Sequence, residues 1–555
     1  MISKLLVVCL ACYSLAAEDV LIDIPLGTLK GSKTNTIAEN KPIYSFTGIP
    51  YAKPIDTDSK FKVAQPAEAW TGVYDATSSK SGCTSFCMVR KMIVGNDDCL
   101  FVDVHTPEPN KDARKAVMVW IHGGGFNMGS GTDPNFFGPD YLVEQDVVVV
   151  TFNFRLGAFG FISTQDATAP GNVGLKDQTL LLKWVRDNIQ YFGGCPHRVT
   201  LFGQSAGGAA VQYHMLTPMS AGLFQNGISQ SGSALNPWAI SYKPRENAFS
   251  LGKSLGIDTS DSEELIKHLS QIPSEKVVEA AMDLDTTQNI FNGRLHAFVP
   301  CVEPDVGQEI FLSQNPWELM KSGKIADIPY MAGLNANESL MMAPVVTGMA
   351  EMINDHFELF VPEDLNLTDA QERKRIENSL REFYYGDREV TKDTIEEFSQ
   401  LMMDTMFAAG VQISLEIINN RKSSPSFNYL FTYSSTSNAG IMKSLGLYDG
   451  EGGVLHGDEM DYMFFVKVFR SGLKPGSPEE KVTHLISKLW SNFAKTGSPT
   501  PTLDDDVTSN WEPIGNEHNY AILDKDLTME KNMLKERMDL WISMYKDLLG
   551  DYIRQ

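Results

Sequence analysis

Short runs of apolar and β-branched residues recur along the chain and alternate with segments of helical pattern. The runs at 117–121 (VMVWI) and 147–152 (VVVVTF) are apolar at consecutive positions, without the alternation of a half-exposed strand. This pattern predicts strands that are buried on both faces, as in a parallel sheet covered by helices. Similar runs predict further strands at 199–202, 228–230, 329–334 and 428–433.

Helical periodicity is clearest at 175–192, and Gly193-Gly194 predicts the end of that helix. Strand, helix and strand in series imply right-handed crossovers. We therefore predict an α/β fold with a mostly parallel central sheet and helices on both faces. The stretches 241–317 and 341–417 are mainly helical in pattern, and we interpret them as long helical insertions.

The first seventeen residues have the pattern of a secretory signal peptide. Lys4 precedes an apolar run at 5–15, and small residues follow at 14–17. The run is too short to span a bilayer, which takes about 20 residues. We predict a signal peptide at 1–17, with an N-terminal core strand as the alternative, and hence a secreted, extracellular protein. No later run of eighteen apolar residues occurs, so we predict no membrane anchor.

Length and charge narrow the class of protein. The 555 residues would suggest three or four domains at roughly 150 residues each, but no long Pro/Gly/Ser linker divides them. Charged residues make up 21% and aromatic residues 10%, which excludes a disordered or fibrous chain. The net charge is −23, and such a surface repels phosphate backbones, so we predict no nucleic-acid partner.

Five cysteines follow residue 17, so at least one thiol stays free. In an oxidising compartment we expect a short disulfide loop that pairs Cys83 or Cys87 with Cys99, and the pairing of Cys195 and Cys301 stays open. Cys83 and Cys87, which have a CxxxC spacing, could alternatively bind zinc. No second Cys pair or HxxxH completes four ligands, so we predict no metal.

The strongest chemical signal is GQSAG at 203–207, directly after the strand at 199–202 and before a helical segment. A serine on a sharp strand-to-helix turn exposes its hydroxyl, and the flanking glycines let neighbouring backbone pass closely. Ser205 is the predicted nucleophile. The alternative is that this G-x-S-x-G match occurs by chance and has no catalytic role. Neither Ser229 nor Ser231 has glycine both two residues before it and two residues after it, so we expect these serines to line or support the site.

A serine nucleophile also needs donors for the oxyanion that forms on a carbonyl. The sequence HGGGF at 122–126 follows a predicted strand, and its glycines can present backbone N–H groups without interfering side chains. Gly124, Gly125 and Ala206 are the predicted oxyanion donors. A simple tight turn is the alternative.

Four motifs together resemble a known family. HGGGF (122–126), FNFRLGAFGF (152–161), GNVGLKDQ (171–178) and GQSAGG (203–208) are similar to the type B carboxylesterase branch of the α/β-hydrolase fold, and in the same order. This branch includes cholinesterases and secreted insect esterases. The resemblance implies one α/β-hydrolase domain over 18–555 and a serine carboxylesterase.

The family's chain order of Ser, then Asp or Glu, then His locates the other two catalytic residues. The pattern G-x-x-x-x-E at 333–338 follows a predicted strand, so the resemblance assigns the acid to Glu338. It assigns the base to His456 in GGVLHGDE, whereas His484 lies in a helical pattern and is expected to be structural. The resulting Ser-Glu-His triad forms an acyl-enzyme and requires no cofactor.

Departures from the family concern the substrate. Gln204 stands where cholinesterases carry Glu, and 83–99 contains no Trp, so a cationic choline ester is not expected. The elbow resembles that of insect esterases that act on juvenile hormone or odorants. We predict a small lipophilic ester from a hormone, odorant, pheromone or xenobiotic, with no prediction of oligomeric state. Gln204, Trp238, Phe298, Phe464 and Phe465 are the candidate pocket residues.

Two further expectations complete the sequence. Of two N-glycosylation motifs, we expect Asn366 to carry the glycan and Asn337, beside the predicted acid, to stay bare. The main alternative to an enzyme is a catalytically inactive adhesion or binding protein on the same fold, and a lipase or amidase is the alternative among enzymes.

Overall fold

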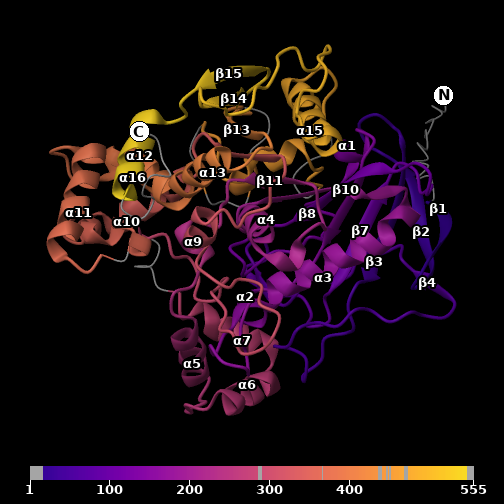
Figure 1. Cartoon of the computed structure of the whole chain (residues 1–555), viewed down its shortest axis with the longest axis horizontal. Coiled ribbons are helices and arrows are strands. Elements are labelled where there is room, and N and C mark those ends of the chain that lie inside the picture. Colours follow the sequence, from indigo (N-terminus) through magenta and orange to yellow (C-terminus); the bar gives the residue numbers. More distant parts are fainter. Residues whose placement is uncertain are drawn as a thin grey trace, which may run out of the picture.

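The fold is built on one large mixed sheet, seen in Figure 1 running from β1 and β2 to β14 and β15. In this computed structural model the described residues are 17–285, 291–365, 367–435, 440–444, 448, 452–467 and 473–546. The predicted signal peptide, apart from Ala17, and the predicted glycosylation site Asn366 therefore lie outside the described residues.

Thirteen strands of the described chain form this sheet, in the order β1-β2-β3-β7-β9-β8-β10-β11-β12-β13-β14-β15, with β4 beside β2. A separate hairpin joins two short strands, β5 (Ser85–Cys87) and β6 (Met92–Val94). The strands of the large sheet are β1 (Glu18–Ile24), β2 (Gly27–Asn35), β3 (Pro42–Pro50), β4 (Val73–Asp75), β7 (Phe101–Thr106), β8 (Lys115–Ile121), β9 (Val148–Phe152), β10 (Gly194–Gln204), β11 (Asn226–Gln230), β12 (Tyr330–Asn335), β13 (Ser426–Phe431), β14 (Asn519–Leu523) and β15 (Leu527–Lys531).

The centre of the sheet is parallel, as predicted. Each neighbouring pair from β9 through β8, β10, β11, β12 and β13 to β14 runs parallel, and the six predicted strands fall on this section. Residues of β8 point alternately into two cores. Val117 and Val119 pack in one core, whereas Met118 and Trp120 pack in the other, so both faces of the sheet are covered.

Both edges of the sheet are mainly antiparallel and were not predicted, and the short strand β4 pairs parallel with β2. β1, β2, β3 and β7 pair antiparallel beside β9, and β15 pairs antiparallel with β14. Segments such as β2 (GTLKGSKTN) are polar and bury few side chains. Their strand structure depends on pairing with distant segments, which local hydrophobic pattern does not report.

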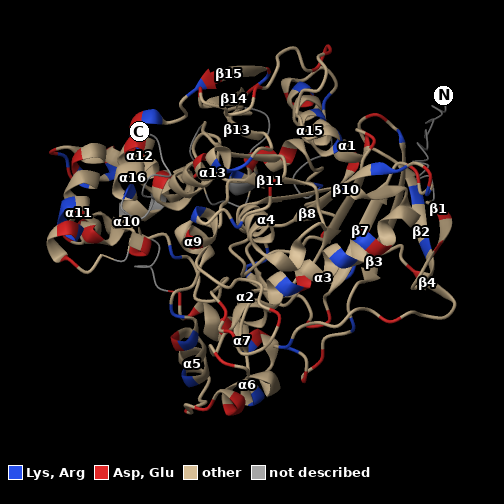
Figure 2. Ribbon diagram, in the orientation of Figure 1, with Lys and Arg blue, Asp and Glu red and all other residues tan. Residues whose placement is uncertain are grey.

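Helices cover the faces and form the predicted insertions. α5, α6 and α7 lie at the bottom of Figure 1, and α10, α11 and α12 lie at the left, with charged residues concentrated on their outer surfaces in Figure 2. The principal helices are α1 (Asp140–Val143), α2 (Gly157–Phe161), α3 (Val173–Asn188), α4 (Ala206–Leu216), α5 (Pro244–Ser254), α6 (Ser262–Gln271), α7 (Ser274–Met282), α9 (Pro316–Lys321), α10 (Ala343–Asp355), α11 (Ala370–Tyr385), α12 (Ile395–Met403), α13 (Ala409–Arg421), α14 (Gly440–Ser444), α15 (Pro478–Thr496) and α16 (Lys535–Met544).

One helical run among the described residues, Lys392–Arg421, has the length and hydropathy to cross a membrane. Its apolar window is 89% buried inside the protein, which is typical of a core helix. The N-terminal turn of α16 contacts the run Lys392–Arg421, because Arg537 donates from Nε to Asp404 Oδ2 at 2.7 Å.

Two motifs of the chain meet in a buried ion pair. Arg155 of FNFRLG donates to both carboxylate oxygens of Asp177, which follows GNVGLK in α3, at 2.8 and 2.6 Å. Both side chains are almost fully buried. The pair therefore links the loop after β9 to the helix that covers the sheet, and loss of either partner would leave an uncompensated charge.

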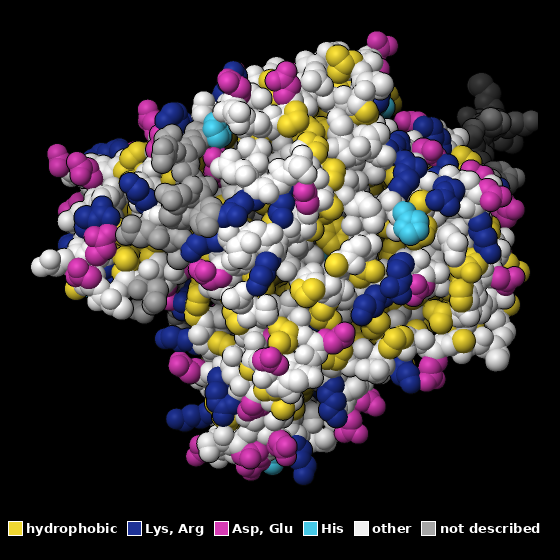
Figure 3. Space-filling model, viewed as in Figure 1, with side chains coloured by type: hydrophobic (Ala, Val, Ile, Leu, Met, Phe, Trp, Pro, Cys, Tyr) yellow, Lys and Arg dark blue, Asp and Glu magenta, His cyan; other side chains and the backbone are white. Residues whose placement is uncertain are grey.

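Among the described cysteines one disulfide forms, between Cys83 and Cys99, whose Cα atoms are 4.9 Å apart. Cys87 remains free, as do Cys195 and Cys301, which are buried. The surface in Figure 3 shows basic and acidic side chains interspersed on the face it presents.

Candidate active site

Ser205 lies on the sharp turn between β10 and α4. Its backbone has φ 58° and ψ −125°, a strained conformation for a residue with a side chain. A Cβ on Gly203 would lie 2.5 Å from the carbonyl carbon of Gly207, and one on Gly207 would lie 2.0 Å from the carbonyl oxygen of Ile121. Only glycine fits at either position, and this packing lifts Ser205 above the end of the strand.

A third glycine supports the turn, and sequence reasoning missed it. A Cβ on Gly232 would lie 2.0 Å from the carbonyl oxygen of Ser205. Gly232 belongs to GISQSGS, where the expectation concerned only the serines. Ser229 donates to Gly208 O at 2.8 Å, so this segment packs directly beneath the predicted nucleophile.

His456 and Glu338 come together although 118 residues separate them. Nδ1 of His456 lies 2.7 Å from Glu338 Oε2. The other carboxylate oxygen of Glu338, which is fully buried, accepts from Ser231 Oγ at 2.5 Å and from the backbone N–H of Asn335 at 2.7 Å. A carboxylate accepts only, so Nδ1 carries a proton, and in the neutral imidazole Nε2 is then the acceptor.

The neighbour of the nucleophile contacts this Nε2. The side-chain amide nitrogen of Gln204 lies 3.0 Å from it. The amide oxygen faces the glycine loop, because a Cβ on Gly123 would lie 2.7 Å from it. Phe407 packs its ring 4.5 Å from the imidazole, a contact with no signal in the sequence.

A second buried carboxyl group lies behind Glu338. Burial, reinforced by the negative charge of Glu338, raises the pKa of Glu459 to about 7. Glu459 accepts from the side chains of Gln230 (3.0 Å) and Asn335 (2.6 Å). Burial also raises the pKa of its neighbour Asp458 to about 8. The pair can therefore be neutral near pH 7, which limits like-charge repulsion at the acid of the site.

The glycine loop at 122–125 lies against the nucleophile. A Cβ on Gly123 would lie 3.0 Å from the Cβ of Ser205. Asn127 holds the end of the loop by donating to Gly125 O at 2.9 Å and to Phe298 O at 3.0 Å. Ala206 begins α4, so its amide faces the same turn.

His122, in the same loop, is buried and stacks on Phe154 at 4.7 Å. Burial lowers the pKa of His122 to about 4. The ring is therefore neutral at physiological pH, and its Nδ1 contacts the carbonyl of Gly123 at 2.8 Å, which fits a role in holding the loop.

Three of the five predicted pocket residues contact His456, its neighbour Phe407 or the segment that holds the glycine loop. Gln204 contacts His456, and Trp238 lies 6.1 Å from Phe407 and donates to Met406 O at 2.6 Å. Phe298, which is buried, is tied to the glycine loop through Asn127.

Phe464, also a candidate pocket residue, packs as a core residue. It is fully buried in a core with Trp120 and Phe202, at ring distances of 4.9 and 6.1 Å. Phe465 pairs its backbone with Gly138 instead of lining the cavity described below. Sequence proximity to His456 does not determine which way a side chain points.

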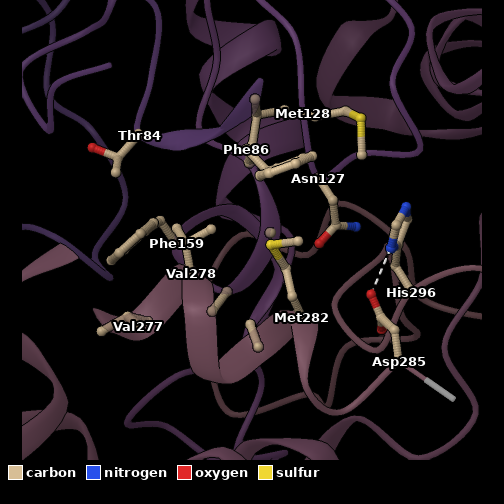
Figure 4. Close-up of a pocket in the computed structure, with 14 residues that line it drawn as sticks. Thr84, Phe86, Asn127, Met128, Phe159, Val277, Val278, Met282, Asp285 and His296 are labelled. Carbon is tan, nitrogen blue, oxygen red and sulfur yellow. Dashed lines mark hydrogen bonds and ion pairs between the residues drawn. The ribbon is translucent and has the colours of Figure 1, made fainter. Parts of the chain in front are cut away.

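A cavity of about 190 Å³ opens beside the glycine loop, between α2, α7 and the loop that carries the disulfide. Figure 4 shows its walls, and Asn127 and Met128 come directly from the end of HGGGF. Its lining is mainly apolar, which suits a hydrocarbon chain. Among the described residues, no cluster of three or more His, Cys, Asp or Glu is arranged to hold a metal ion.

Comparison with known proteins identifies the family. The family model of the carboxylesterase family matches residues 18–541. The chain belongs to the carboxylesterase family. It is a carboxylic ester hydrolase with the α/β-hydrolase fold, as the resemblance of the motifs implied.

Similar proteins come from several insects. Esterase FE4 of Myzus persicae is 32% identical over 506 residues, covering 89% of this chain and 86% of the relative. Juvenile hormone esterase of Tribolium castaneum is 31% identical over 531 residues, covering 90% and 89%. The crystal structure of juvenile hormone esterase from Manduca sexta, with OTFP covalently attached, superposes with a TM-score of 0.85 at 27% identity. It covers 95% of this chain and 100% of that one.

Proposed function

We propose that this carboxylesterase uses Ser205 as nucleophile, His456 as general base and Glu338 as the acid that orients the base. The observation that carries this proposal is the 2.7 Å contact between His456 Nδ1 and Glu338 Oε2 beside the strained turn at Ser205. His456 takes the hydroxyl proton of Ser205 while the oxygen attacks the ester carbonyl. The N–H groups of Gly124, Gly125 and Ala206 hold the oxyanion.

Collapse of this intermediate breaks the bond to the alcohol, which leaves with the proton from His456. Water then attacks the acyl-enzyme, again with His456 as base, and releases the acid and Ser205. Apart from this water, the steps use only side chains and backbone of the chain.

The substrate proposed for this site is an uncharged, lipophilic ester. No carboxylate stands next to the nucleophile, where Gln204 has a neutral amide, and the nearby cavity is mainly apolar. The N-terminal signal pattern, the disulfide and a relative named venom carboxylesterase support a secreted protein, with Asn366 as its proposed glycan acceptor. Degradation of a hormone, odorant or xenobiotic ester would be its physiological role.

A fluorophosphonate probe and a panel of p-nitrophenyl esters test the proposal. The wild type should be labelled once, on Ser205, and should prefer medium-length acyl chains over acetylcholine-type substrates. S205A should lose the label and roughly 10⁶-fold in kcat. Labelling of S205A, or activity that survives it, would show that another residue is the nucleophile.

A further inference from the structure

A second pairing of histidine with a carboxylate lies at the wall of the apolar cavity. His296 Nδ1 contacts Asp285 Oδ2 at 2.7 Å, and the other oxygen of Asp285 accepts from the backbone N–H of Ala297 at 2.8 Å. Both oxygens of Asp285 are thus used to fix His296 and its segment. No step of the proposed mechanism employs this pair.

The pair touches the predicted oxyanion loop. A Cβ on Gly125 would lie 2.7 Å from Cδ2 of His296 and 2.9 Å from its Nε2, so the imidazole packs directly on that glycine. Asn127 joins the same two segments, since it donates to the carbonyl oxygens of Gly125 and Phe298. His296 therefore stands within a few ångströms of where an ester carbonyl would be held.

The free nitrogen of His296 is the chemically informative atom. Because Asp285 accepts at Nδ1, a neutral imidazole carries its proton there, and Nε2 accepts a hydrogen bond. Figure 4 shows this nitrogen directed away from Asp285. Nε2 has no hydrogen-bond partner within the described parts of the chain, and the side chain is 19% exposed.

The rest of the cavity is apolar and of limited size. Its volume of about 190 Å³ holds roughly six groups the size of water or methylene. The apolar walls include Phe86, Met128, Phe159, Val277, Val278 and Met282. A hydrocarbon chain gains free energy here by burial, whereas a polar atom finds a partner only at the end near the glycine loop.

We propose that His296 is a substrate-positioning residue that accepts a hydrogen bond from a hydroxyl carried on the ester, while the hydrocarbon beyond that hydroxyl fills the cavity. This inference rests on the proposed site at Ser205 and specifies its substrate class as a hydroxylated lipophilic ester. Because His296 packs on Gly125, the hydroxyl lies a few bonds from the ester carbonyl. It belongs to either the acyl or the alcohol arm.

Two series of esters test the proposal and separate the arms. The acyl series is methyl octanoate, methyl 3-hydroxyoctanoate and methyl 3-methoxyoctanoate. The alcohol series is octyl acetate, 4-hydroxyoctyl acetate and 4-methoxyoctyl acetate. In one series, wild-type kcat/KM should favour the hydroxy ester over the methoxy ester by roughly 3- to 10-fold, since the methoxy group cannot donate.

Substitutions then identify the acceptor. H296F should abolish the preference for the hydroxy ester while keeping hydrolysis of the unsubstituted ester. H296Q should restore part of the preference, because its amide oxygen can accept. D285A, which frees the ring, should weaken the preference mainly through KM. As a control, H356Q alters a similar but exposed pairing with Glu358 and should leave every ratio unchanged.

Two results would overturn the proposal. One is a wild type that treats hydroxy and methoxy esters alike in both series. The other is an H296F variant that lowers kcat/KM for all three esters of a series by one factor, which indicates a purely structural role. Either result leaves the esterase intact, whereas activity that survives S205A would contradict the proposed function itself.

Discussion

Gln204 donates its side-chain amide to Nε2 of His456 across 3.0 Å, on the opposite side of the ring from Glu338. The imidazole is therefore held at both nitrogens: the carboxylate fixes a proton on Nδ1, and the amide donor requires an unprotonated Nε2. For catalysis by the proposed route, Nε2 must exchange this amide for the hydroxyl of Ser205. The residue next to the nucleophile thus influences when the base is available.

Q204E should reverse the effect of this contact. A carboxylate cannot donate to Nε2 and instead favours the protonated imidazole, so the acid limb of the pH profile of kcat/KM should move to higher pH. At neutral pH we expect a loss of roughly tenfold. Q204M, which removes the donor without adding charge, should move the limb in the same direction but by less than Q204E. The exposed substitution Q65E, which adds the same charge elsewhere, serves as control, and an unmoved profile in Q204E contradicts the prediction.

The two buried carboxyl groups near His456 should differ sharply in their importance. E338Q removes the acceptor that fixes the tautomer of the base, so we expect kcat to fall about 10⁴-fold. E459Q changes only hydrogen bonds to Gln230 and Asn335, and we expect a loss of roughly tenfold or less. Steady-state kinetics on a p-nitrophenyl ester measures both. Equal losses would show that the acid of the triad has been assigned wrongly.

Glu459 should also make stability depend on pH. Its folded-state pKa of about 7 lies above the ordinary value of 4.5, so the folded protein holds a proton that the unfolded chain releases. The stability from this proton is complete below about pH 4.5 and is lost as pH rises through 7, by about 3 kcal/mol. Urea unfolding across this range should show a smaller fall in E459Q than in the wild type. The exposed control E263Q should follow the wild type, and equal slopes in all three would contradict the prediction.

Gly232 should be as necessary as the glycines of the motif. In G232A the new Cβ would meet the carbonyl oxygen of Ser205, so the nucleophile must shift. We expect a destabilisation of about 1–3 kcal/mol together with a clear loss of kcat. The matched control is G348A in α10, where an added Cβ meets no atom within 4 Å. If G232A retained wild-type kcat, the proposed support of the turn would be absent.

The disulfide should contribute measurably to stability. It closes a loop with a sequence separation of 16, for which the chain-entropy model gives about 3 kcal/mol. C83S and C99S should therefore lower the thermal midpoint of unfolding to the same extent as each other, whereas C87S should leave it unchanged. A destabilised C87S beside an unaffected C83S would point to the alternative pairing.

How far the sequence predicts this protein depends on whether the signal is local. Strands such as 117–121 are apolar on both faces, and the GQSAG turn requires its own strand and helix, so both could be identified from consecutive residues. The antiparallel strands at the edges are polar and depend on distant partners. The choice between Cys83 and Cys87 likewise needed three-dimensional positions, because their spacing to Cys99 is compatible with either pairing.

The pocket shows the same limit. Phe464 and Phe465 follow His456 closely, yet Phe464 packs into the opposite core with Trp120. His296 carries no motif at all, since its partner Asp285 and its neighbour Gly125 come from separate segments. Positions that meet only through the tertiary fold leave no pattern in a single sequence.

The order of the reacting groups along the chain has a consequence for biosynthesis. Ser205 and its strained turn emerge from the ribosome long before His456, and β13 needs β14, near the C-terminus, as its outer neighbour in the sheet. By the proposed mechanism, a nascent chain that has only reached the middle of the fold carries a serine hydroxyl without its base and cannot hydrolyse esters. Hydrolytic competence therefore arrives late in translation.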